Sequence, residues 1–96
     1  MSIVESLRAT FDRCLELAGR KNADYAGADD PFRNFRGSVT VGVPVERAML
    51  VRLMDKINRI SNLLDKEPAV VGESLDDSIE DAINYLALLK AFREKQ

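Results

Sequence analysis

Apolar residues return at helical spacing in three separate stretches of the chain. In the first stretch, Ser2 followed three positions later by Glu5 has the form of a capping box, which favours a helix start. Apolar residues then recur every three or four positions, a period that predicts one buried helical face. This stripe consists of Ile3, Leu7, Phe11, Cys14, Leu15 and Ala18. We expect this helix to end between Gly19 and Tyr25.

Two further stretches carry the same period. The second begins at Pro44, a favourable first-turn residue, and ends near Asp65. Its stripe consists of Val45, Met49, Leu53, Ile57, Ile60 and Leu64. The third opens near Glu73 or Ser74 and runs to about Arg93. Its stripe consists of Leu75, Ile79, Ala82, Ile83, Leu86 and Leu89. The pattern therefore predicts an all-α fold of three main helices.

Residues 24–44 interrupt this pattern. Glycine and proline recur through the segment without sustained periodicity, which is typical of a loop. A structureless loop of ~20 residues is uncommon in a compact domain and is usually functional or disordered. This segment also carries aromatic and basic side chains, so we expect an ordered functional loop rather than a passive linker. Residues 38–43 could form a short extended piece within it.

The composition predicts a single small domain over residues 1–96. Its 46% content of hydrophobic residues is too high for a disordered chain. A chain this short buries only roughly 60–65% of its unfolded surface, so we expect a homodimer or homotetramer that completes the helical bundle. The net charge of −2 argues against binding to a nucleic-acid polymer. No apolar run approaches the ~20 residues that span a bilayer, and no secretory signal is visible, so we expect no membrane contact.

The cysteine and histidine content excludes several kinds of catalytic and metal site. The single cysteine, Cys14, cannot form an internal disulfide, which favours a reducing, cytoplasmic setting. Its position on an apolar stripe predicts a small buried hydrophobe rather than a reactive thiol. The chain contains no histidine, which excludes Ser-His-Asp and Cys-His catalysis and any zinc site that uses imidazole.

The third predicted helix is acidic at its start. Residues 73–81 hold five acids, and at 100° per residue Glu73, Asp77 and Asp81 lie within about 80° of one another. Three carboxylates one turn apart suit Mg²⁺ or Mn²⁺, which prefer oxygen ligands. The alternative is a solvated face, because the macrodipole also favours acids near a helix N-terminus. From the pattern alone the solvated face is the stronger interpretation.

The second predicted helix supplies a complementary polar set. Arg52, Asp55, Lys56 and Arg59 combine one acid with three bases, as a triphosphate site requires. An ordinary surface lattice of salt-linked side chains is the alternative. These polar faces lie opposite the predicted apolar stripes. A site shared by the two helices would therefore need oblique packing or a partner subunit.

Several separated motifs, in order, resemble one family. They are KNADY, DPFRNFRGS, GVP, RLMDKINR and ESLDDSIEDAINYLALL, and they cover about Lys21 to Leu89. This order is similar to MazG-like proteins of phages and bacteria, the nucleotide-modification-associated or dATP/dGTP diphosphohydrolase-like group. The resemblance implies an all-α nucleoside triphosphate pyrophosphatase built across subunits. It also implies cleavage of a purine dNTP between its α and β phosphates, with Mg²⁺ or Mn²⁺, to control the nucleotide pool.

The metal motifs of that superfamily are only partly present. The pattern ExxE on one helix is replaced by Arg52-Leu-Met-Asp55-Lys56, which leaves Asp55 as its one acid. The pattern ExxD on the next helix matches Glu73-Ser-Leu-Asp76 literally, but Glu73, Asp77 and Asp81 are closer to the narrower group. The metal count and the retention of activity therefore stay open. A non-catalytic nucleotide-binding subunit and a purely structural helical oligomer remain alternatives.

The resemblance gives each candidate residue an expected role. The metal ligands would be Asp55, Glu73, Asp77 and Asp81, with Asp55 and Glu73 also orienting the attacking water. Lys56 would offset charge on the phosphates. Substrate contacts are expected from Lys21, Tyr25, Asn34, Arg36, Arg52, Arg59 and Asn84. Tyr25 or Phe35 could stack on the base, although the aromatic residues could equally pack the loop onto the bundle.

Overall fold

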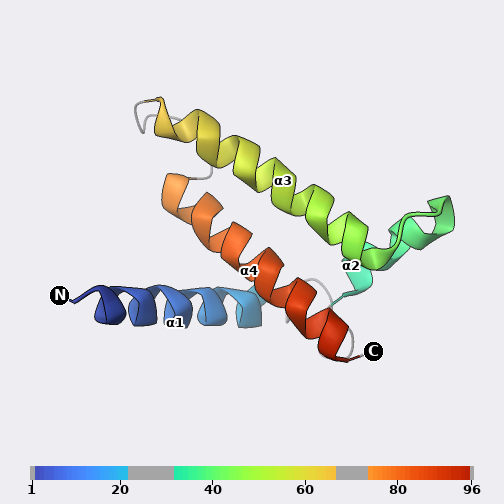
Figure 1. The fold of residues 1–96 in the computed structure, drawn as a ribbon, viewed down its shortest axis with the longest axis horizontal. Coiled ribbons are helices and arrows are strands. Elements are labelled where there is room, and N and C mark those ends of the chain that lie inside the picture. Colours follow the sequence, from blue (N-terminus) through green and yellow to red (C-terminus); the bar gives the residue numbers. More distant parts are fainter. Residues whose placement is uncertain (1, 22–31, 67–73, 96) are drawn as a thin grey trace.

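Most of the described residues lie in helices. The computed structural model describes residues 2–21, 32–66 and 74–95. Its elements are α1 (Ile3–Lys21), α2 (Arg33–Arg36), the 3₁₀ helix η2 (Gly37–Val41), α3 (Val45–Leu64) and α4 (Leu75–Glu94) (Figure 1). No strand occurs in these three described ranges, so the all-α prediction is confirmed. None of the helices in them is long and apolar enough to cross a membrane.

Local signals place the helix starts where the sequence predicts them. The backbone N–H of Glu5 donates a hydrogen bond to the Ser2 hydroxyl at 3.1 Å, in front of α1. A full capping box joins Ser74 and Asp77 at the start of α4, and Pro44 precedes α3. The Ser2 and Ser74 caps satisfy backbone donors that the first turn leaves without a helical partner, whereas Pro44 makes no side-chain cap hydrogen bond. The helix starts were therefore predicted correctly.

The expected loop before α3 is helical in its described part. The Ser38 hydroxyl lies 2.8 Å from the carbonyl oxygen of Phe35 and 2.7 Å from that of Val43, which ties η2 to its neighbours. Gly42 ends η2 with a φ of 81°, a conformation that only glycine adopts without strain. The predicted extended piece at 38–43 is therefore wrong. Residues 24–31 of the expected loop lie outside the described residues.

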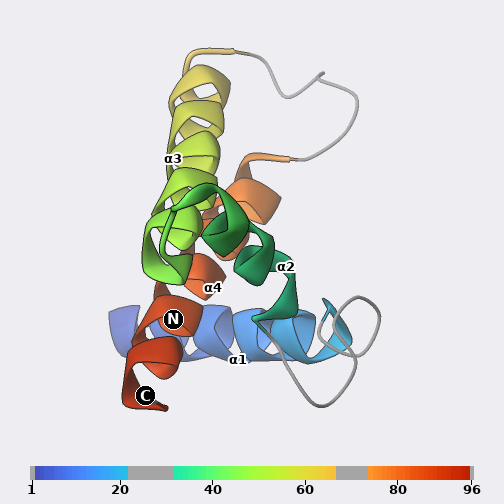
Figure 2. The same ribbon diagram turned by 90° about the vertical axis from the view of Figure 1, so that its right-hand side faces the viewer.

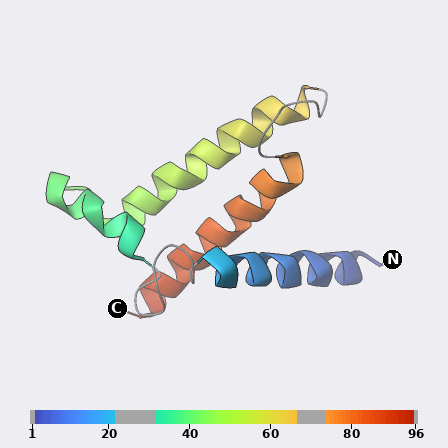
Figure 3. The same ribbon diagram turned by 180° about the vertical axis from the view of Figure 1, so that it is seen from behind.

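The hydrophobic core lies where α2 meets one end of the α3–α4 pair. α3 and α4 run antiparallel side by side (Figures 1 and 3). The core cluster consists of Phe32, Phe35, Val45, Met49 and Phe92. Phe32 meets Phe92 edge to face with ring centroids 5.1 Å apart, and Phe35 meets Tyr85 at 6.2 Å. Phe35 therefore packs the segment onto the bundle, the alternative to stacking on a base.

Several residues of the predicted stripes are not buried. On α1 only Cys14 is buried, while Ile3, Leu7, Phe11 and Leu15 are exposed. Ile57 and Leu64 on α3, and Ile79 and Leu86 on α4, are exposed as well. The reason is that α1 packs chiefly on α4, across which it passes in Figure 2, and α3 covers a different side of α4. The outer faces of all three long helices remain uncovered by described residues.

Candidate functional site

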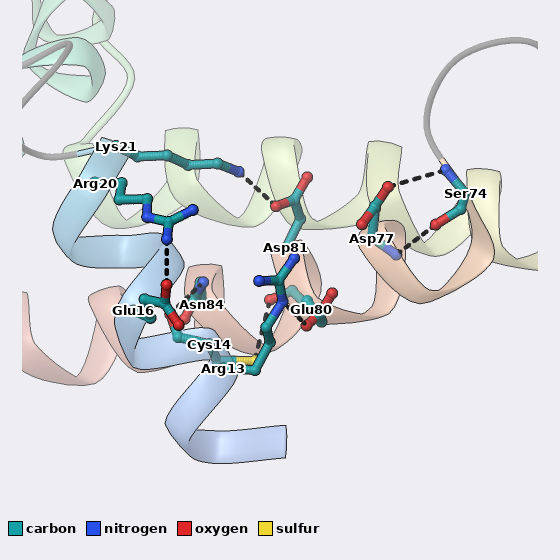
Figure 4. Close-up of polar contacts among 10 residues, drawn as sticks. All are labelled: Arg13, Cys14, Glu16, Arg20, Lys21, Ser74, Asp77, Glu80, Asp81 and Asn84. Atoms are coloured by element: carbon teal, nitrogen blue, oxygen red, sulfur yellow. Dashed lines mark hydrogen bonds and ion pairs between the residues drawn. The ribbon is translucent and has the colours of Figure 1, made fainter. Parts of the chain in front are cut away.

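Three of the predicted site residues meet around one carboxylate. Asp81 of α4 lies 2.6 Å from the Nζ atom of Lys21, at the end of α1 (Figure 4). Its second oxygen lies 2.9 Å from the Nζ atom of Lys56, on α3. The Asp81 side chain is only 12% exposed, so both contacts are short charge-assisted bonds shielded from much of the solvent. Three helices thus contribute one group each to this Lys21–Asp81–Lys56 cluster.

The cluster lies on the same helix faces as the core. On α3, Lys56 follows Met49 by seven residues, or about two turns, and therefore lies on the side that carries Val45 and Met49. On α4, Asp81 precedes the core residue Phe92 by eleven residues, or about three turns. The α3–α4 interface is therefore apolar at one end and charged toward the other. Of the two expected ways to join these helices, oblique packing or a partner subunit, the second is not needed for Lys56 and Asp81, which meet within one chain.

Other polar contacts fix α1 against α4 next to the cluster. The Arg13 Nε atom lies 3.4 Å from Glu80, whose side chain is 13% exposed. The Asn84 amide donates a hydrogen bond to the Cys14 carbonyl oxygen at 3.1 Å (Figure 4). Asn84, predicted to contact substrate, thus binds the backbone of α1. The sequence signalled Glu80 only as an acid near the predicted metal sector.

The buried thiol of Cys14 belongs to the same contact. Burial is the main reason that the pKa of Cys14 is raised above its ordinary value. The carboxylates of Glu80 and Asp81 raise it further, and the charge of Arg13 opposes them. A raised pKa keeps the thiol protonated and unreactive. The prediction of a buried small hydrophobe at Cys14 is confirmed.

The predicted metal ligands do not gather in the described part of the chain. The Asp77 carboxylate accepts a hydrogen bond from the Ser74 N–H at 3.4 Å, so this exposed side chain caps α4. Asp55 is exposed on α3, and Glu73 lies outside the described residues. Among residues 2–21, 32–66 and 74–95, no group of three or more acids or cysteines could hold a metal ion. The described acids alone therefore do not fit a magnesium or manganese centre.

The remaining candidates lie elsewhere on α2 and α3. Asn34 and Arg52, both exposed, line one shallow hollow between α2 and α3. Arg36 is exposed on α2, and Arg59 is half-buried on α3. Because Arg52 precedes Lys56 by one helical turn, the hollow and the cluster lie along the same stretch of α3. Tyr25 lies outside the described residues.

No family model, no curated protein and no solved structure matches this chain. The resemblance carried by the sequence motifs therefore remains a prediction. A chemical role for this chain therefore rests on the Lys21–Asp81–Lys56 cluster.

Sequence reasoning missed one residue beside the cluster. Ser78 is fully buried, and its hydroxyl has no hydrogen-bond partner among the described residues. On α4, Ala82 follows Ser78 by four residues and Tyr85 follows it by seven. Alternating steps of four and three mark the buried seam of a helix that packs on another, and this spacing could have identified Ser78 as buried.

Proposed function

We propose that this chain is a nucleoside triphosphate pyrophosphohydrolase that cleaves dNTPs to dNMP and pyrophosphate at the Lys21–Asp81–Lys56 cluster. The observation that carries the proposal is the convergence of two lysines, from different helices, on one half-buried carboxylate. All three residues were predicted site residues on sequence grounds. A preference for purine deoxynucleotides is the finer part of the proposal and follows from the motif resemblance alone.

The charges of the cluster suit a polyphosphate. Each ammonium group brings a full positive charge and three N–H donors, and a lysine is a common phosphate ligand in proteins. Without nucleotide, Asp81 pairs with both groups and so holds them at one place. When phosphate oxygens take over donors from Lys21 and Lys56, the Asp81 carboxylate can accept a hydrogen bond from the attacking water. Catalysis of this kind rests on positioning and electrostatics.

The proposed role of a divalent cation rests on the sequence motifs alone. Bound Mg²⁺ or Mn²⁺ would offset negative charge on the phosphates. Glu73, the predicted ligand nearest the start of α4, lies outside the described residues. The requirement for a cation is therefore best tested directly, by adding each ion and by removing it with a chelator.

Turnover with a matched pair of lysine variants tests the proposal. The protein is incubated with each dNTP and Mg²⁺ or Mn²⁺, and chromatography follows dNMP and pyrophosphate. We expect Lys56→Met to lower kcat/KM about 100-fold, because a donor to the developing phosphate charge is lost. Lys90→Met is the control, since Lys90 is exposed and pairs with Glu94 one turn away on α4. Equal turnover by the two variants would show that the cluster is not the site.

One observation favours a second candidate, a non-catalytic nucleotide-binding subunit. The described residues gather two cations at one place but no group of three acids. Such a protein would bind a dNTP, lose that binding in Lys56→Met and produce no dNMP with any metal ion. If the chain neither binds nor hydrolyses nucleotides, a structural helical oligomer is the remaining interpretation.

A further inference from the structure

α1 carries an apolar surface that the rest of the described chain leaves open. Five of its apolar side chains are 47–73% exposed, and we call them the α1 ladder. The α1 ladder consists of Ile3, Val4, Leu7, Phe11 and Leu15. The contacts of α1 with α4 lie beside this surface: Cys14, which follows Leu7 by seven residues and so shares its side of the helix, is buried, and its carbonyl binds Asn84. In Figures 1 and 3 the N-terminal half of α1 projects away from α4.

The size of this surface matches what a protein partner covers. The exposed parts of the five side chains amount to on the order of 600 Å², whereas each partner in a standard interface buries about 800 Å². A patch of this size is at the upper limit for a monomeric protein and marks an interaction site. The partner must therefore cover most of the length of α1.

The charges of α1 favour another protein surface over a lipid surface. Helices that lie on membranes carry a basic polar face. The polar positions of α1 instead mix three acids with four bases: Glu5, Arg8, Asp12, Arg13, Glu16, Arg20 and Lys21. Several are already paired, because Arg13 binds Glu80 and Arg20 binds Glu16. Little net charge remains to attract anionic lipid.

The order of residues along α1 fits a second α1 in the opposite direction. Leu7, Phe11 and Leu15 follow one another in steps of four and form a single ridge. Consider two antiparallel α1 helices related by a two-fold axis at the height of Thr10. Leu7 is then level with a point between the partner's Phe11 and the partner's Leu15. A self-complementary surface of this kind is what a two-fold dimer requires.

Two charged residues give the same register independently. Arg8 and Asp12 lie one turn apart along one edge of the α1 ladder. Neither forms an ion pair among the described residues. In the antiparallel arrangement Arg8 comes level with the partner's Asp12, and the symmetry creates this pair twice.

We propose that a second copy of this chain docks on the α1 ladder, with the two α1 helices antiparallel and Arg8 facing the partner's Asp12. This interface needs neither nucleotide nor the Lys21–Asp81–Lys56 cluster, so it stands or falls separately from the proposed function. It specifies which surface a homodimer uses and in which register.

A charge-swap experiment tests both the surface and the register. Light scattering after size exclusion, over a range of concentrations, gives the dimer dissociation constant. We expect Arg8→Asp and Asp12→Arg each to raise it about tenfold, because each creates two like-charge contacts. The double variant restores the pairs in reversed order, so its dissociation constant should return to within about threefold of the wild-type value.

Apolar variants complete the test. Phe11→Ser should dissociate the dimer while circular dichroism keeps its helical signal, because Phe11 is 58% exposed in one chain. Val41→Ser is the control, since Val41 is 76% exposed on η2, away from α1. A wild-type chain that stays monomeric at every concentration, including one that binds lipid vesicles instead, would overturn the proposal. A dimer unaffected by Phe11→Ser would do so as well, and failure of the double variant to restore binding would overturn the register.

Discussion

Two neighbouring carboxylates on α4 have similar burial but different partners. Glu80 meets one arginine from α1, whereas Asp81 meets two lysines from two helices. The Arg13–Glu80 pair matches one positive with one negative charge. The cluster at Asp81 has one more positive than negative charge among its three groups. The proposal that the cluster binds phosphate rests on this pairing of two ammonium groups with one carboxylate.

At the residue scale, the buried hydroxyl of Ser78 makes a testable difference to stability. A buried hydroxyl without a partner loses its hydration, which costs about 1–3 kcal/mol. We therefore expect Ser78→Ala to raise the free energy of unfolding, measured by urea denaturation, by about 1 kcal/mol more than Ser61→Ala. Ser61 is exposed on α3, so that control carries only the gain in helix propensity. A loss of stability in Ser78→Ala would mean that the hydroxyl has a partner in solution.

At the element scale, helix positions could be predicted but helix orientations could not. Capping and proline signals are local, so the starts of α1, α3 and α4 followed from a few residues each. The buried faces depend on which neighbours arrive. The predicted stripe of α3 began with three steps of four, and each such step turns about 40° around the helix, so Ile57 lies about 120° from Val45. The face that packs on α4 instead includes Lys56, which hydrophobicity alone assigned to the opposite side.

The short helices show a second limit of the sequence. α2 and η2 span four and five residues, so neither contains a full repeat from which a period could be read. Gly37 at the start of η2 and Gly42 just after it also favoured a loop, because glycine is typical of turns. Lys21, Lys56 and Asp81 were all candidate site residues in the sequence, and whether they form a site stays a prediction. Their meeting in one chain depends on helix packing and could not be read from spacing.

The capping box of Ser74 and Asp77 stabilises the start of α4. The backbone N–H of Asp77 donates to the Ser74 hydroxyl at 3.1 Å, and the Asp77 carboxylate returns the bond. We expect Ser74→Ala to lower the free energy of unfolding by about 1 kcal/mol, the usual cost of a lost cap. Ser61→Ala, the same chemical change on an exposed helical turn, should not lower it. Equal effects in urea denaturation would show that the cap contributes nothing.

The cap also bears on the choice of site variants. A substitution at Asp77 changes the start of α4 as well as any metal site. Asp81 does not share this ambiguity, because it lies beyond the first turn of α4 and its ion pairs with Lys21 and Lys56 lie between helices. Variants at Asp81 therefore separate function from helix formation better than variants at Asp77.

At the scale of the whole molecule, one end of the α3–α4 pair holds the core and the other holds the charges. Aromatic side chains from α2 close the apolar end, and α1 reaches the charged end through Lys21. The apolar α1 ladder is left exposed by the described residues, and it is the surface on which we propose that a second copy docks. The core and the proposed dimer contact thus involve other parts of the molecule than the cluster, where Lys21 is 52% exposed.

The most direct test of the proposed function compares two neutralised carboxylates. Asp81→Asn and Glu80→Gln each remove one charge from a side chain of α4 that is 12–13% exposed and ion-paired to α1. The measurement is the rate of dNMP formation from each dNTP, with Mg²⁺ or Mn²⁺ and with circular dichroism to verify folding. We predict that Asp81→Asn loses about 100-fold in kcat/KM while Glu80→Gln stays within about twofold of the wild type. Equal rates for both variants and the wild type would contradict the assignment of the active site to the Lys21–Asp81–Lys56 cluster.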